Sequence, residues 1–84
     1  MIRVELLHIP DCPNTDAARR LLAACLDEVG IEAGIEDREG PFPSPTVRVN
    51  GEDVMGLPPT SDASCRLDVP TRERILAALR RATA

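Results

Sequence analysis

Residues 2–30 read IRVELLHIPDCPNTDAARRLLAACLDEVG and combine a strand pattern with a helix pattern. Residues 2–8 alternate between apolar and polar side chains, which predicts a strand with one buried face. Residues 14–29 repeat apolar side chains at helical spacing, and Gly30 is a typical helix stop. The apolar positions of this helix are Ala18, Leu21, Leu22, Cys25, Leu26 and Val29. The chain therefore opens with a strand, a turn that contains Cys12, and a helix.

Three further strands are predicted after this helix. Residues 31–36 alternate between apolar and polar positions, as in the first strand. Residues 46–49 and 52–55 flank Asn50-Gly51, which is typical of a two-residue hairpin turn because both turn positions need positive φ. Residues 40–45 contain three prolines and therefore predict a loop.

A second helix is predicted over residues 71–82, where Thr71 is a favourable cap and apolar positions recur at helical spacing. Residues 56–70, which precede it, show no regular pattern and are expected to be irregular. Since every predicted strand has one polar face, both helices should lie on one face of a single sheet. We therefore expect an α/β fold in one domain over residues 1–84, with a four-stranded mixed sheet.

The connections between the predicted strands fix their directions. A helix between the first two strands requires that they run parallel, whereas the hairpin turn makes the last two antiparallel. The loop before the hairpin is too short for a second crossover, so the third strand should run opposite to the first two. The loops at residues 9–13, 38–45 and 56–70 then meet at one edge of the sheet. Cys12 and Cys65 are therefore candidates for neighbours in the fold.

The composition argues against several classes of partner. The chain has a formal net charge of -4, which does not fit nucleic acid or an anionic membrane surface, because both require basic patches. No secretory signal pattern and no apolar stretch of membrane-spanning length is seen, so a cytoplasmic protein is expected. Three cysteines in such a chain suit reactive or metal-binding thiols better than a disulfide framework. No nucleotide, haem or flavin motif is present, so no cofactor is expected.

Cys12 is the residue with the clearest chemical signature. It lies at the turn between the first strand and the first helix, and Pro13 suits the first position of a helix. The free backbone amides of a first helical turn stabilise a thiolate and lower its pKa. Cys12 is therefore a candidate nucleophile, and the alternative is that it is only a small residue at a helix end.

The residues around Cys12 allow more than one interpretation. His8 ends the first strand and either tunes the thiol or is an ordinary structural histidine. Asp16, in the first turn of the helix, is either a catalytic acid or only a favourable charge at the helix dipole. Cys25 lies on the apolar face of the helix and is expected in the core. Phe42 and its neighbouring prolines either form an apolar rim beside Cys12 or cover the end of the core.

Two segments carry a resemblance to a known superfamily. His8-Ile9-Pro10, followed by Cys12-Pro13-Asn14-Thr15 at the start of a helix, resembles the thioredoxin-like superfamily. Ser44-Pro45-Thr46-Val47, before the hairpin, is similar to the cis-proline element of that superfamily. The resemblance implies a glutaredoxin-sized, thioredoxin-like βαβ-ββα fold with strand order 2-1-3-4. It also implies that Cys12 is the nucleophile, with cis-Pro45 against it and Ser44 in support.

Thr15 departs from the dithiol members of this superfamily, which have a resolving cysteine at that position. A local Cys-x-x-Cys disulfide is therefore impossible, and either monothiol chemistry or a distant thiol must replace it. Cys65 is the candidate resolving thiol, because its loop begins at the same edge of the sheet. The alternative is that Cys65 is an ordinary loop thiol.

Several segments are also similar to small bacterial thioredoxin-fold proteins described as alkylmercury-lyase-like. These segments are Cys12-Pro13, Ser44-Pro45-Thr46, the Asn50-Gly51 hairpin and Ser64-Cys65-Arg66-Leu67. The resemblance implies that Cys12 and Cys65 bind a soft metal ion, with Asp11 or Asp16 as the acid that protonates a leaving carbon.

Three functional hypotheses remain open at this point. The first is a thiol-disulfide oxidoreductase, in which the Cys12 thiolate attacks a small thiol or protein disulfide partner and Cys65 resolves the mixed disulfide. The second is a protein that binds mercury or cleaves organomercurials with Cys12 and Cys65 as ligands. The third is a scaffold or carrier without enzymatic activity, in which Cys12 has an ordinary thiol pKa of about 8.5.

Overall fold

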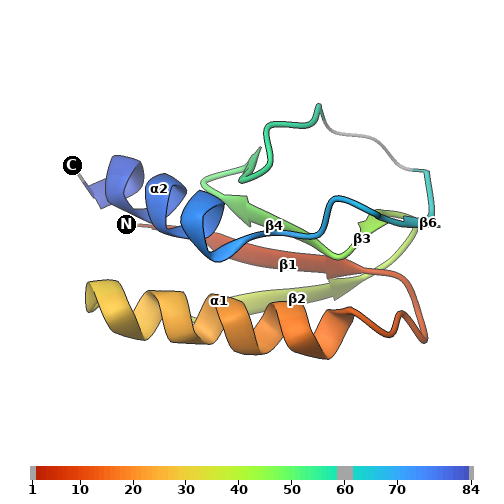
Figure 1. Cartoon of the computed structure of the whole chain (residues 1–84), viewed down its shortest axis with the longest axis horizontal. Coiled ribbons are helices and arrows are strands. Elements are labelled where there is room, and N and C mark those ends of the chain that lie inside the picture. Colours follow the sequence, from red (N-terminus) through yellow and green to blue (C-terminus); the bar gives the residue numbers. More distant parts are fainter. Residues whose placement is uncertain (1, 59–61, 84) are drawn as a thin grey trace.

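The computed structural model describes residues 2–58 and 62–83. In this part of the chain it has a mixed α/β fold with two helices, a four-stranded sheet and a two-stranded sheet (Figure 1). The elements in chain order are β1 (Val4–His8), α1 (Thr15–Val29), β2 (Ile35–Glu39), β3 (Pro43–Ser44), β4 (Thr46–Val49), β5 (Glu52–Asp53), β6 (Ser64–Cys65) and α2 (Arg72–Thr83).

The main sheet has the strand order β2-β1-β4-β5. β1 is parallel to β2 and antiparallel to β4, with Val4 opposite Ile35 on one side and Val49 on the other. β4 and β5 are antiparallel and joined by Asn50-Gly51, where both residues have positive φ. The predicted strand directions and the hairpin turn are thus confirmed.

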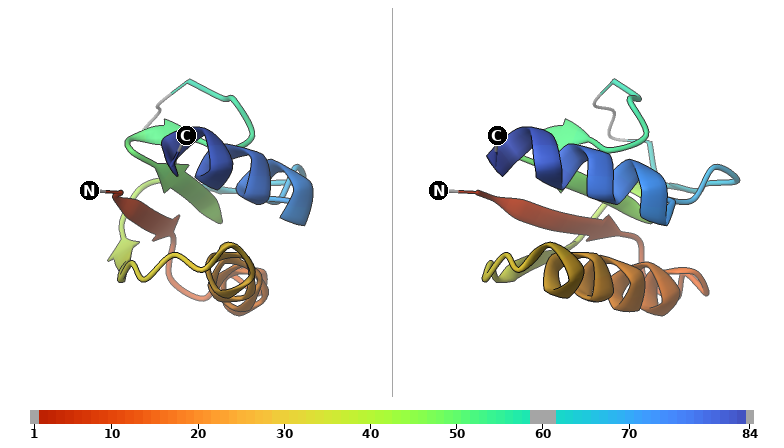
Figure 2. Two further views of the ribbon diagram at one scale, coloured as in Figure 1. Left: turned by 90° about the vertical axis from the view of Figure 1, so that its left-hand side faces the viewer. Right: turned by 60° about the vertical axis from the view of Figure 1, so that its left-hand side comes forward.

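Both helices lie on one face of the main sheet, as expected (Figure 2). They bury the inward side chains of β1 and β4, and α1 packs directly against α2. The most deeply buried members of this core are Leu6, Leu22, Val47, Ile75 and Leu79. Because the core has no aromatic side chain, aliphatic packing alone holds the helices on the sheet.

The strand predicted over residues 31–36 is wrong in its position. β2 begins only at Ile35, because the end of α1 uses the backbone of the preceding residues. Gly30 has a left-handed conformation, and the Ile31 amide donates to the carbonyl of Leu26 at 2.9 Å. This hydrogen bond closes the helix C-terminus and commits Ile31 to the capping motif, which keeps it out of the strand.

The predicted strand at 52–55 is also shorter in the structure. β5 ends at Asp53, because the Asp53 side chain accepts a hydrogen bond from the backbone amide of Met55 at 2.8 Å. Such a local bond turns the chain away from the sheet. At the start of the second helix the prediction is confirmed, since Thr71 Oγ1 accepts from the Arg74 amide as a cap.

Two short strands lie in segments that were predicted to be irregular. β3 and β6 form a parallel pair in which Pro43 lies opposite Ser64 and Ser44 lies opposite Cys65. The Arg66 amide donates to the carbonyl of Ser44 at 2.7 Å and extends this pairing. The small sheet fixes Cys65 at the end of the molecule where β1 turns into α1 (Figure 1).

Candidate functional site

The turn after β1 and the small β3-β6 sheet bring two thiols together. The Sγ atoms of Cys12 and Cys65 are 4.0 Å apart, and the Cys65 thiol donates toward the Cys12 sulfur. Cys12 is half-buried and Cys65 is exposed, so both are accessible to a small partner. The peptide bond between Ser44 and Pro45 is cis, as the resemblance implies. The expected proximity of Cys12 and Cys65 is therefore confirmed.

The backbone of the β1–α1 turn sets the position of Cys12. Asp11 has a positive φ of 58°, which turns the chain sharply after the strand. The Thr15 amide then donates to the Cys12 carbonyl at 3.3 Å. Asn14 is the N-cap of α1, so Pro13 lies one residue before the cap and not at the first helical position that the sequence suggests. The turn, more than the helix itself, therefore carries Cys12.

The surroundings of Cys12 favour its ionised form. Partial burial acts to raise the pKa of this thiol, but the neighbouring Ser44 and Thr15 hydroxyls, the Asn14 backbone and the Cys65 thiol act to lower it. The net effect lowers the pKa of Cys12 below its ordinary value. The sulfur is therefore stabilised as a thiolate by groups from three separate segments.

Ser44 and Thr15 are placed to serve this sulfur. The two residues are 0% and 7% exposed, and their hydroxyl oxygens have no hydrogen-bond partner in the described part of the chain. Buried hydroxyls normally find a partner, and an ionised sulfur beside them would supply one. Thr15, which stands where a resolving cysteine would be expected, is thus available as a hydrogen-bond donor to the Cys12 sulfur.

Cys65 is affected in the opposite direction. Its hydrogen bond to Cys12, together with burial and the charge of the Cys12 thiolate, raises the pKa of the Cys65 thiol. Because the two thiols interact, they titrate as a pair in which Cys12 ionises first. The two thiols therefore differ, since the pKa of Cys12 is lowered and that of Cys65 is raised.

A buried arginine that sequence reasoning missed holds the Cys65 segment in place. The Arg66 side chain is 3% exposed and pairs with Asp53 at 2.8 Å and Asp68 at 2.8 Å. Its Nη1 also donates to Thr46 Oγ1 at 3.0 Å, next to the cis peptide bond. No local signal could identify this group, since Asp53 and Thr46 come from other strands. Arg66 thus ties β6 to β4 and β5.

His8 and Asp16 make their direct contacts with other residues than Cys12. His8 Nε2 is hydrogen-bonded to Asp37 Oδ1, and Asp37 Oδ2 also accepts from Arg19 Nη2 at 2.6 Å. Arg19 in turn donates to Asp16 Oδ1 at 2.5 Å. These contacts tie α1 to β1 and β2 beside the nucleophile.

Cys25 and Phe42 lie outside the cysteine pair. Cys25 is 2% exposed within the core, and burial raises the pKa of its thiol, so the expected core position is confirmed. Phe42 is half-buried, and its ring lies against the backbone of Gly40. It therefore covers part of the loop that leads to the cis-proline.

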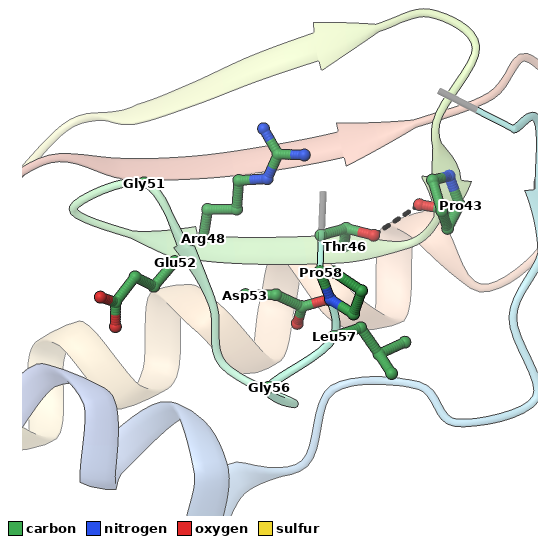
Figure 3. Close-up of a pocket in the computed structure, with 9 residues that line it drawn as sticks. All are labelled: Pro43, Thr46, Arg48, Gly51, Glu52, Asp53, Gly56, Leu57 and Pro58. Carbon is green, nitrogen blue, oxygen red and sulfur yellow. Dashed lines mark hydrogen bonds between the residues drawn. The ribbon is translucent and has the colours of Figure 1, made fainter. Parts of the chain in front are cut away.

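Two surface cavities differ in chemical content. A shallow cavity of about 230 Å³ is lined by Cys12 together with His8, Thr15, Asp16 and Arg19, among others. Another, of about 290 Å³, lies between β4, β5 and residues 56–58 and has no cysteine or histidine in its lining (Figure 3). Figure 3 also shows the Thr46 hydroxyl bonded to the Pro43 carbonyl beneath that cavity. Of these two cavities, only the first has a thiol in its lining.

The described residues contain no cluster of three or more His, Cys, Asp or Glu side chains that could hold a metal ion. Neither helix in the described part of the chain is long and apolar enough to cross a membrane. No family model, curated protein or solved structure matches this chain.

Proposed function

We propose that this protein is a thiol-disulfide oxidoreductase of the thioredoxin-like superfamily, with Cys12 as the attacking thiolate and Cys65 as the resolving thiol. The observation that carries the proposal is the 4.0 Å separation of the two sulfurs. The opposite pKa shifts of the two thiols give each a distinct role, because the one that ionises first attacks first.

The architecture supports the superfamily assignment. The strand order β2-β1-β4-β5, with two helices on one face, matches the order 2-1-3-4 that the resemblance implies. The cis bond before Pro45 and the position of Cys12 at the β1–α1 turn agree with it as well. The use of Cys65 in place of a residue at position 15 is the feature that separates this chain from the dithiol pattern.

The reaction is a pair of thiol-disulfide exchanges. The Cys12 thiolate attacks one sulfur of a substrate disulfide, forms a mixed disulfide and releases the other half as a thiolate, which takes up a proton. The Cys65 thiol then loses its proton and attacks the Cys12 sulfur, which forms a Cys12–Cys65 disulfide and releases the second half. The substrate is reduced to two thiols, and a low-molecular-weight thiol reductant returns the protein to its dithiol form.

The test is to treat the reduced protein with hydroxyethyl disulfide and to map the products by mass spectrometry. The wild type should lose two hydrogens and give a Cys12–Cys65 crosslink. Cys65→Ser should stop at a mixed disulfide on Cys12, whereas Cys12→Ser should form neither product. Cys25→Ser is the matched control and should behave as the wild type. A crosslink to Cys25, or none at all, would rule out the resolving role of Cys65.

A second candidate function is the binding of a soft cation such as mercuric ion. The specific observation is that the gap between the two sulfurs exceeds the 2.05 Å of a disulfide bond, which leaves the thiols free to flank a two-coordinate ion. Asp16 is bound to Arg19, so Asp11 is the freer of the two acids suggested for cleavage of a carbon–metal bond. This function predicts one mercuric ion per chain, lost in both Cys12→Ser and Cys65→Ser; unchanged stoichiometry would exclude it.

A further inference from the structure

We infer that the cavity at Cys12 favours small disulfides that carry a positive charge and disfavours anionic ones. The inference names the substrate class of the proposed oxidoreductase and rests on that function. It comes from the balance of charged groups around the cavity, from a buried threonine in its lining whose hydroxyl has no partner in the described residues, and from its size.

The lining of the cavity contains more acidic than basic groups. Together with Cys12, its lining consists of His8, Ile9, Asp11, Thr15, Asp16, Arg19 and Glu39. Asp11 and Glu39 are exposed and form no ion pair in the described part of the chain. An incoming partner therefore meets two carboxylates whose charge is not compensated by a neighbour.

The one arginine of the cavity is already engaged. Arg19 donates through Nε and Nη2 to Asp37 and through Nη1 to Asp16. Two carboxylates thus share one guanidinium, and His8 is a second partner of Asp37. Arg19 is consequently not available to bind the carboxylate of an anionic thiol.

The arginine beside Cys65 is engaged as well. Arg66 follows Cys65 directly, but its guanidinium is buried and held by Asp53 and Asp68. Its charge is therefore neutralised before it can act on a partner at Cys12. The uncompensated charges in the lining of the cavity are therefore those of Asp11 and Glu39.

A second observation indicates that the cavity is built to receive a reacting group. Thr15 lines it, is 7% exposed, and has a hydroxyl without a hydrogen-bond partner in the described residues. A buried donor beside the nucleophile is useful when a charged sulfur is present there. The volume of about 230 Å³ fits one half of a small disulfide, since a water molecule occupies about 30 Å³.

The physical consequence is a selectivity that depends on salt. A negative surface potential raises the local concentration of cations and lowers that of anions, and salt screens both effects over about 10 Å at 0.1 M. Disulfides with an amine near the sulfur should therefore react faster than those with a carboxylate or sulfonate.

The test uses three methanethiosulfonates that differ in charge: the neutral methyl, the cationic trimethylammonioethyl and the anionic sulfonatoethyl reagent. In each case the Cys12 thiolate attacks the sulfur that carries the alkyl group. The alkylthio group and Cys12 then form a mixed disulfide, and methanesulfinate is released. Second-order rate constants are measured on a Cys25→Ser/Cys65→Ser background, so that Cys12 is the only target, and are divided by those of 2-mercaptoethanol. The cationic-to-anionic ratio should be about tenfold at low salt and should approach unity at 0.5 M salt.

The variants of the test separate the cavity from the overall charge. Asp11→Asn/Glu39→Gln should lower the ratio at least threefold, and asparagine tolerates the positive φ at position 11. Asp27→Asn/Glu32→Gln removes the same charge at the far end of α1 and should leave the ratio unchanged. A normalised ratio near unity at low salt, or an equal loss in both variants, would overturn the inference. The reaction needs no second thiol, so failure of the Cys12–Cys65 crosslink would not affect this result.

Discussion

At the scale of single residues, the ionisation of Cys12 responds to two buried hydroxyls beside it. The hydroxyls of Ser44 and Thr15 have no hydrogen-bond partner in the described residues, and each acts to lower the pKa of the Cys12 thiol. Hydrogen bonds to charged groups are stronger than neutral ones. A substitution at either residue should therefore change the pKa of the Cys12 thiol while Cys12 itself is kept.

Ser44→Ala is expected to raise the pKa of Cys12 and to slow its alkylation by iodoacetamide at pH values below that pKa. Loss of one hydrogen bond to a charged group costs on the order of 1.5 kcal/mol, which corresponds to roughly tenfold in rate. The measurement is the rate as a function of pH on a Cys25→Ser/Cys65→Ser background. Thr15→Ala should act in the same direction. If both variants have the same pH profile as the parent protein that retains Ser44 and Thr15, the assignment of these hydroxyls as hydrogen-bond donors is contradicted.

The ionisation of Cys12 should also make stability depend on pH. The pKa of the Cys12 thiol is lower in the folded protein than in the unfolded chain, where thiols titrate at about pH 8.5. Between these two values the unfolded chain binds more protons, so the free energy of unfolding rises with pH. This contribution is complete above about pH 8.5 and is lost as pH falls through the folded pKa. Urea unfolding of the reduced protein should show the rise, and Cys12→Ser should show a smaller one.

At the scale of elements, Arg66 is the residue that connects the Cys65 segment to the main sheet. β6 has only two residues, so its short ladder with β3 supplies few hydrogen bonds. The buried contacts of Arg66 with Asp53 and Thr46 hold the same segment from the side of β4 and β5. The distance between the two thiols therefore depends on an ion pair as well as on the small sheet.

Arg66→Met is expected to leave the nearly buried Asp53 carboxylate without its partner and to destabilise the fold by about 3 kcal/mol. It should also make the Cys12–Cys65 disulfide easier to reduce by dithiothreitol, because Cys65 is no longer held beside Cys12. Arg48→Met is the control, since Arg48 on β4 forms no ion pair in the described residues. Equal disulfide equilibria in the two variants would show that Arg66 has a structural role only.

At the scale of the whole molecule, the proposed disulfide would join the first turn of the chain to a segment near the last helix. The two cysteines are 53 positions apart. A crosslink over such a loop restricts the unfolded chain strongly. Oxidation should therefore change stability as well as activity.

The oxidised protein should resist urea more than the reduced one. Loop-closure entropy for 53 residues gives an upper value of about 4 kcal/mol, from which any strain in the closed form is subtracted. Unfolding curves of both forms measure the difference, and Cys25→Ser should reproduce it. A wild type whose midpoint falls on oxidation would indicate that the native positions of the two sulfurs do not suit a disulfide.

Much of this arrangement follows from patterns that are local in sequence. The alternation of β1, the apolar repeat of α1, the glycine that ends it and the Asn50-Gly51 turn each depend on neighbours within a few residues. Strand directions follow from the lengths of the connections, and they brought Cys12 and Cys65 to one edge. These features were predictable because periodicity and turn geometry act over short stretches of chain.

Other features were decided only by contacts between distant segments. The start of β2 depended on the capping bond from Ile31, and the β3-β6 pair depended on two strands too short to show a period. The partners of Arg66 come from three segments, and the two carboxylates that occupy Arg19 come from α1 and β2. A charged side chain takes its role from whichever groups the folded chain brings within reach of it, so only the tertiary structure shows which charges are paired and which remain free.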